Sequence, residues 1–147
     1  MLIMRGDDIL LIERGKSPFG FAPPAGHVDE HGSFEQAAKD EVREEVGLTP
    51  LNLVLIREGR KENKCRREGG TWHYWKIYKV EADGGIKRSE EETKQADWFP
   101  PDKINSLAQR TEKYLAGRVP EDEWQKSPGI EPVWCEWFKE IGILSKQ

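Results

Sequence analysis

The sequence predicts an α/β fold in which helices on both sides cover a mixed β-sheet. Two observations support this prediction. Segments with the two-residue alternation of strands are interspersed along the chain with segments that have the 3.6-residue period of amphipathic helices. Hydrophobic residues make up 36% of the 147 residues, which is enough apolar material for one packed core. We therefore expect a single domain spanning residues 1–147, an α/β/α sandwich around a mixed sheet.

The first half of the chain is expected to form a hairpin, a loop and a helix. The ranges are strands at 1–4 and 8–13, a loop over 15–24 rich in glycine and proline, and a helix over 33–46. Ser33 is a good N-cap, and Gln36 three residues later completes a capping box. Gly47 supplies the stop at the C-terminal end. This helix has the best defined boundaries in the sequence.

The second half is expected to complete the sheet and to add two helices. The ranges are strands at 51–57, 71–80 and 96–99, a charged loop over 58–70, and helices at 102–115 and 131–143. The strand at 71–80 has large apolar groups on both faces, for example Tyr78 on one and Ile77 on the other. We therefore expect this strand to be covered on both sides.

Composition excludes several classes of protein. The 27 acidic and 23 basic residues give a net charge of −4, which argues against a general nucleic-acid coat and against a membrane-surface binder. No apolar run approaches the roughly 20 residues that a spanning helix needs, and the first residues lack a signal-peptide pattern. Cys65 and Cys135 have no zinc-ligand spacing, so we expect free thiols and a cytoplasmic location, although a disulfide between them stays open.

Three glutamates depart from the amphipathic pattern of the helix at 33–46. Glu41 and Glu45 project within its apolar sector, and Glu44 lies at the edge of that sector. Their spacing of three and four residues lets them converge on one point. Partly buried carboxylates repel one another unless a cation neutralises them, and Mg²⁺ prefers such oxygen ligands. A glutamate-rich surface helix is the commoner explanation of three glutamates alone, but the loop Pro23-Pro24-Ala25-Gly26 brings bare backbone to the helix entrance.

The segment from Gly26 to Leu48 resembles the signature box of the Nudix hydrolases. The box has the pattern Gly, five residues, Glu, seven residues, then Arg-Glu-aliphatic-x-Glu-Glu-x-Gly-aliphatic. The positions that match in register are Gly26, Glu41, Val42, Glu44, Glu45, Gly47 and Leu48. Gly32 stands where the box has its first glutamate, and Asp40 stands where it has arginine. These two departures put catalytic efficiency in doubt more than metal binding.

The resemblance implies a Mg²⁺-dependent pyrophosphohydrolase, with Mn²⁺ as a second usable cation. Its substrate would be a small nucleotide in which a nucleoside diphosphate is linked to another group. The implied ligands of the metal are Glu41, Glu44, Glu45 and the carbonyl group of Ala25, and the implied catalytic residues are Glu41 and Glu44. The alternative is a Nudix-fold nucleotide-binding module with impaired catalysis. A homodimer is compatible with the resemblance, by analogy alone.

Four residues are candidates for contact with the substrate. Trp72 and Tyr74 have rings that could stack on a base, although aromatic side chains more often belong to a core. Arg57 begins a basic stretch that could hold phosphates, and a solvated hairpin loop is the alternative. Glu92 closes the acidic run after Ser89, and the resemblance implies an additional carboxylate from such a loop. An ordinary solvated acidic turn explains that run equally well.

Overall fold

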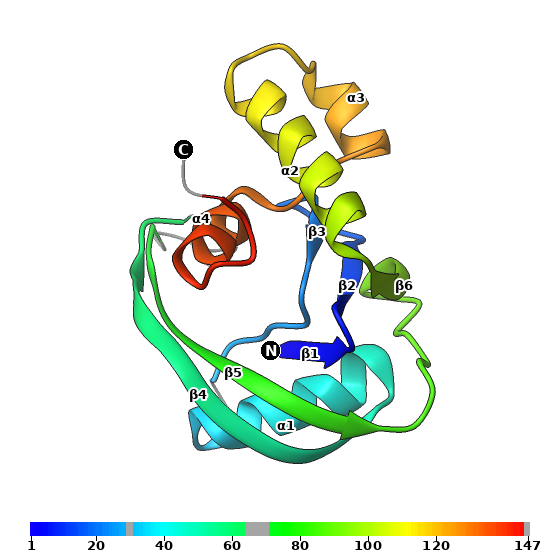
Figure 1. Ribbon diagram of the computed structural model, residues 1–147, viewed down its shortest axis with the longest axis vertical. Helices are drawn as coiled ribbons and strands as arrows, with labels where there is room; N and C mark the ends of the chain where they lie inside the picture. The colour runs from blue at the N-terminus through cyan, green and yellow to red at the C-terminus, as the bar shows by residue number, and fades with distance from the viewer. Residues whose placement is uncertain (29–30, 64–70, 146–147) are drawn as a thin grey trace.

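The computed structural model describes residues 1–28, 31–63 and 71–145, and it is an α/β fold (Figure 1). In chain order the elements are β1 (Leu2–Arg5), β2 (Asp8–Arg14), β3 (Phe21–Ala22), α1 (Phe34–Val46), β4 (Thr49–Lys61), β5 (His73–Asp83), β6 (Thr93–Phe99), α2 (Pro101–Leu115), α3 (Glu121–Lys126) and α4 (Pro132–Glu140). Among these described residues, no helix is long and apolar enough to cross a membrane.

The strands form one mixed sheet. Its order is β3-β2-β1-β5-β4, and β6 pairs with β2 outside that path. The pairing of β1 with β5 is parallel, with Leu2 opposite Lys79, and the other ladders between these strands are antiparallel. The predicted fold class, with its mixed sheet, is therefore confirmed.

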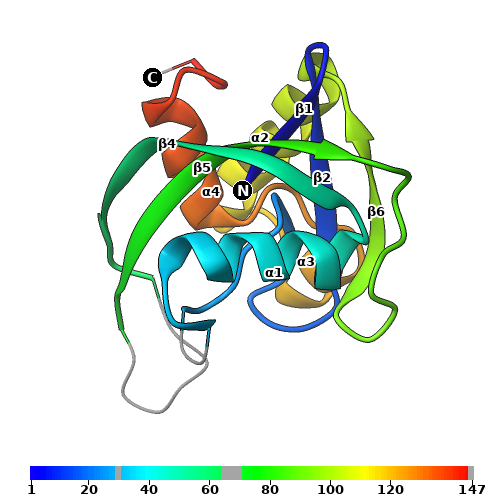
Figure 2. The ribbon, with the colours of Figure 1, turned by 90° about the horizontal axis from the view of Figure 1, so that it is seen from below.

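Helices cover both faces of the sheet (Figure 2). On one face, α1 packs Ala38, Val42 and Val46 into a cluster of buried residues that includes Tyr78 of β5. On the other face, α2 and α4 pack into a second cluster that includes Ile77 of β5. Neighbouring residues of β5 thus belong to different clusters, as expected for a strand covered on both sides.

The N-terminal end of α1 forms as predicted except for one half of the capping box. The Ser33 hydroxyl accepts a hydrogen bond from the backbone N–H of Gln36 at 3.1 Å, and Gly47 ends the helix with φ of 70°. The side chain of Gln36 does not reach back to Ser33. Its Nε2 donates to Oδ1 of Asp40 at 2.8 Å, and a hydrogen bond to this carboxylate one turn ahead is stronger than one to a neutral backbone group.

The expected charged loop over 58–70 is wrong for its first residues, because β4 continues to Lys61. Cross-strand contacts explain this extension: Tyr74 donates its hydroxyl to Oε1 of Glu58 at 2.6 Å, and the Arg60 guanidinium lies 4.3 Å from the Trp72 ring centroid. These pairs favour a strand that charge alone did not indicate. Residues 64–70, including Cys65, lie outside the described part of the chain.

Two short elements were not predicted. Strand β3 lies within the expected loop over 15–24 and pairs with β2, and it is too short to show any alternation. Helix α3 buries Trp124, whose ring stacks on Tyr114 with the centroids 4.0 Å apart. Its six residues have no periodic apolar pattern that would have indicated a helix. The tertiary contact of one tryptophan holds this helix in place.

Candidate active site

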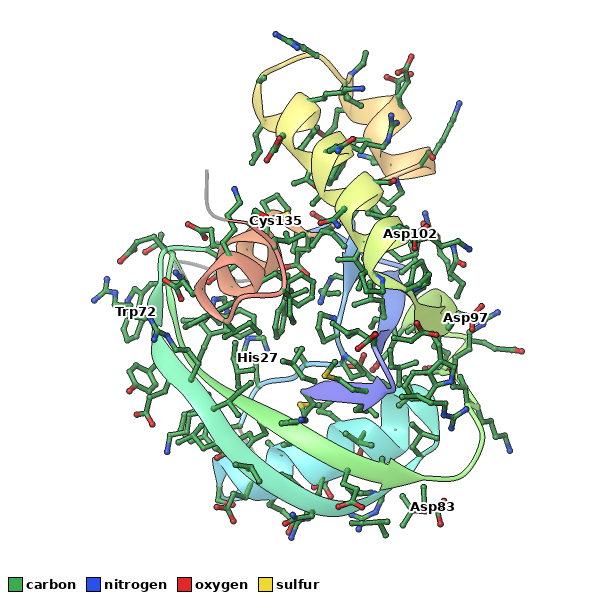
Figure 3. The ribbon with its side chains drawn as sticks, in the orientation of Figure 1. His27, Trp72, Asp83, Asp97, Asp102 and Cys135 are labelled. Atoms are coloured by element: carbon green, nitrogen blue, oxygen red, sulfur yellow. The ribbon has the colours of Figure 1, made fainter. Side chains whose placement is uncertain are left out.

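A large cleft lies beside α1. Its volume is about 1010 Å³, at the upper end of the range for ligand pockets. Its walls come from α1, from β5, from the chain after β2 and from the start of α4. The charged and aromatic residues that line it include Arg14, Glu41, Glu45, Tyr74, Glu92 and Glu131. Figure 3 shows one lining residue, His27, inside the fold, between α4 and the long strands β4 and β5.

Three carboxylates meet in this cleft. One ligand atom each from Glu41, Glu45 and Glu92 lies within 4.8 Å of the other two. Glu41 and Glu45 are one helical turn apart on α1, which places them on the same face. Glu92 arrives from the turn before β6, and this turn is fixed against α1 because the Ser89 N–H donates to the Glu45 carbonyl at 2.8 Å. The fold thus adds a loop carboxylate to two helix carboxylates.

Burial makes this cluster unfavourable without a cation. Glu45 is 5% exposed, and burial raises its pKa well above the ordinary value, with a further contribution from hydrogen bonding to Glu41. Burial also raises the pKa of Glu41, and the charges of Glu44 and Glu92 act in the same direction. Three oxygen donors whose negative charges oppose one another are the ligand set that a hard divalent cation requires. The residues present therefore fit Mg²⁺ or Mn²⁺.

The structure places the other predicted metal ligands differently. Glu44 is exposed and does not share the group of atoms formed by Glu41, Glu45 and Glu92. The inward convergence of all three helix glutamates is therefore wrong for Glu44, which keeps only an electrostatic influence on Glu41. Ala25 lines the cleft, and the next residue, Gly26, lies directly against Glu41: a Cβ at Gly26 would overlap the carboxyl group of Glu41.

Asp40, at the position of the expected arginine, holds a histidine instead. Its Oδ2 is 2.7 Å from Nδ1 of His31, and Nε2 of the same ring is 3.8 Å from Oε1 of Glu41. The hydrogen bond to Asp40 raises the pKa of His31, which favours the protonated form of the ring that faces Glu41. Besides His31 and Gln36, Arg43 is a third and longer partner of Asp40 at 3.6 Å. The sequence pattern did not single out His31. The signal available in the sequence was the acidic residue at position 40. It stands where the Nudix box has arginine, so Glu41 lacks that cationic neighbour and another one could be sought.

Only part of the predicted substrate-contact set lies in the cleft. Tyr74 and Glu92 line it, and Tyr74 is 46% exposed. Trp72 is 48% exposed and lies at the outer edge of the fold, away from His27 (Figure 3), where it contacts Arg60. Arg57 is also exposed and outside the cleft lining, with Glu140 as its ion-pair partner at 3.9 Å.

Several other lining residues were not predicted as site residues. His27 and His73 face each other with their Nε2 atoms 3.2 Å apart. Nδ1 of His73 donates to the Asn63 carbonyl at 3.1 Å, so Nε2 of a neutral His73 is an acceptor. Arg14 and Glu131 also line the cleft, and burial raises the pKa of Glu131 to about 7. No local pattern in the sequence distinguishes these two residues from ordinary charged positions.

Comparisons with known proteins relate this chain to one family. The model of the NUDIX domain family matches residues 1–128. An ADP-ribose pyrophosphatase from Methanocaldococcus jannaschii is 31% identical over 117 residues, which span 78% of this chain and 67% of that protein. A NUDIX hydrolase from Nitrosomonas europaea is 27% identical, with a TM-score of 0.54 over 82% of this chain and 89% of that one. A MutT NUDIX hydrolase from Burkholderia pseudomallei is 24% identical and shares the fold, with a TM-score of 0.59 over 69% of this chain and 79% of that one. The chain belongs to the Nudix family and is a Nudix hydrolase, a class that acts on nucleotide derivatives.

Proposed function

We propose that this protein is a Mg²⁺-dependent pyrophosphohydrolase that cleaves a phosphoanhydride bond of a nucleoside diphosphate linked to another group. The observation that carries the proposal is the group of carboxylates formed by Glu41, Glu45 and Glu92 at the wall of a cleft large enough for a nucleotide. The relative from Methanocaldococcus jannaschii makes ADP-ribose the first substrate to test.

The oxygens of Glu41, Glu45 and Glu92 would hold the metal, with the Ala25 carbonyl as a further candidate ligand. When bound, the cation supplies charge neutralisation at the phosphate oxygens and a lower pKa for a coordinated water. The cleft excludes bulk solvent from the deeply buried Glu45, which strengthens its interaction with any cation. Mn²⁺ suits the same oxygen ligands and is the alternative metal.

Glu41 and Glu44 are the proposed catalytic carboxylates. A base must accept a proton from the attacking water, and Glu41 combines cleft exposure with a position beside the other carboxylates. Glu44 is exposed one turn from Glu41, and its carboxylate is the second candidate to accept that proton, from the solvent side of the cluster. His31 acts as a positioning residue: Asp40 fixes the ring through Nδ1, and Nε2 faces Glu41.

Tyr74 and the neighbouring ring of Phe34 are the proposed contacts for the nucleoside. Both residues line the cleft, and their ring centroids are 6.4 Å apart in an edge-to-face arrangement. A flat base can stack on such a wall. Trp72 and Arg57 would contribute only if the substrate extended beyond the cleft, because both lie outside its lining.

An assay of phosphate and nucleoside monophosphate release tests the proposal. The panel contains ADP-ribose, nucleoside triphosphates and dinucleoside polyphosphates, each with Mg²⁺ and with Mn²⁺. We expect turnover of at least one nucleotide that requires the metal and is abolished in Glu45→Gln. Glu35→Gln, an exposed change on the same helix, is the matched control. Silence on the whole panel together with no calorimetric metal binding would leave the nucleotide-binding module as the better description.

A further inference from the structure

Glu131 is held rigidly at the edge of the cleft, at the N-cap position of α4. Its backbone N–H donates to the Phe21 carbonyl at 2.9 Å, and its carbonyl accepts from the N–H groups of Trp134 and Cys135 at 2.8 and 3.2 Å. Gly20 presses against it from the other side, because a Cβ at Gly20 would come within 2.7 Å of the Glu131 backbone. The backbone of Glu131 is therefore fixed, and it cannot move so as to bring the side chain into bulk water.

The carboxyl group of Glu131 lines the cleft without a partner in the described part of the chain. The residue is 5% exposed, and among the described residues its carboxyl oxygens make no hydrogen bond and no ion pair. Arg14 is the neighbouring charge that acts on it, yet the two groups are too far apart to form an ion pair. The Nε of Arg14 is itself buried without a hydrogen-bond partner among the described residues. Native proteins rarely keep such groups unsatisfied unless a ligand or water completes them.

The chemistry of these two residues indicates what would complete them. A carboxyl group at the cleft wall accepts a hydrogen bond from an N–H or O–H group and repels a phosphate. Glu131 lines the same cleft as the metal-binding carboxylates Glu41, Glu45 and Glu92, so a nucleotide whose phosphates lie at those carboxylates can also reach Glu131. The part of such a ligand that carries uncharged donors is its nucleoside.

We propose that Glu131 binds a hydrogen-bond donor on the nucleoside part of the substrate, either an N–H group of the base or a hydroxyl group of the ribose, and so selects which nucleoside the cleft accepts. This inference rests on the proposed function, because it takes the ligand to be a nucleotide. It adds a specificity-determining residue outside the Nudix box, on an element that begins after the residues matched by the family model.

Binding of reaction products tests the inference without requiring turnover. The probes are the four common nucleoside monophosphates and inorganic pyrophosphate, measured by calorimetry with wild type, Glu131→Met, Glu131→Gln and the exposed control Glu136→Gln on the same helix. Glu131→Met keeps the length of the side chain and removes the acceptor. We expect its Kd for the preferred nucleoside monophosphate to rise about 10- to 100-fold, with an intermediate loss in Glu131→Gln and none in Glu136→Gln.

Analogues distinguish the two sources of the donor. Purine riboside monophosphate lacks the exocyclic groups of the base, and the 2′-deoxy and 3′-deoxy nucleotides each lack one hydroxyl. The analogue that lacks the recognised donor should bind wild type as weakly as the parent nucleotide binds Glu131→Met. The affinity of this analogue should be the same for wild type and for Glu131→Met. Melting temperatures of both variants should equal or exceed that of wild type, since an unpartnered buried carboxyl has been removed.

Three results would overturn the inference. One is equal affinity of every nucleotide for wild type and Glu131→Met. Another is an equal loss of pyrophosphate affinity, which would indicate a general change of the cleft. The third is the absence of any nucleotide binding to wild type at millimolar concentration. If Glu131 discriminates among nucleotides in binding but the protein hydrolyses no substrate, the proposed function is refuted and this inference stands.

Discussion

Ionisation of Glu131 should couple the stability of the fold to pH. Burial raises its pKa to about 7 in the folded protein, against an ordinary value of 4.5 that applies when the chain is unfolded. Between these two values the unfolded chain releases a proton that the folded protein keeps, so the free energy of unfolding falls as pH rises through this window. The full cost is present above about pH 7. The gap between the two pKa values corresponds to about 3 kcal/mol.

Urea denaturation of wild type and Glu131→Gln at pH 5 and pH 8 measures this cost. The amide cannot ionise, so the variant should be more stable than wild type by up to about 3 kcal/mol at pH 8 and by much less at pH 5. Other titrating groups are common to both proteins and cancel in the difference. Glu136→Gln, an exposed change on α4, should show no such trend. An equal difference between wild type and Glu131→Gln at both pH values would refute this account of Glu131.

The carboxylate cluster gives three further expectations. Glu45→Gln should abolish Mn²⁺ binding, measured by electron paramagnetic resonance, while the melting temperature rises or stays the same, because a buried carboxylate is lost. Gly26→Ala should displace the Glu41 carboxyl group and lower kcat at unchanged secondary structure by circular dichroism. His31→Ala should weaken Mn²⁺ binding or lower kcat about 10- to 100-fold. The same change in an Asp40→Arg background should cost little, and an equal loss in both backgrounds would show that His31 does not position Glu41.

Local rules in the sequence accounted for α1 and its place in the fold. Ser33 satisfies the first turn, and Gly47 supplies the left-handed conformation that ends the helix, so both boundaries depend on neighbouring residues alone. The apolar positions Ala38, Val42 and Val46 follow from the helical period and are all buried. The Nudix pattern added the register of the glutamates. None of these inferences needed knowledge of a distant segment.

The division of roles among the glutamates depended on a segment far away in the chain. A helical wheel places Glu45 within the apolar sector and Glu44 at the edge of that sector, so it does not decide whether Glu44 faces the cleft. In the structure Glu44 is exposed, whereas Glu45 is only 5% exposed. The difference arises because the turn before β6 lies against the last turn of α1, with the Ser89 N–H bound to the Glu45 carbonyl. The same contact brings Glu92 to the cluster. Propensity and period describe only the helix, so they could not reveal which side that turn covers.

The two departures from the Nudix pattern are connected in the structure. Asp40 replaces a cation with an anion, and His31 brings an imidazole with a raised pKa to the same place by bonding to Asp40 and facing Glu41. Gly32, directly after His31, has φ of 86°, a conformation that a glutamate adopts only at a cost. This turn lets the chain pass from His31 to the cap of α1 while the imidazole folds back over the helix. A glutamate at position 32 would oppose that turn. The glycine and the aspartate are therefore better explained as parts of one alternative arrangement around Glu41 than as two independent losses.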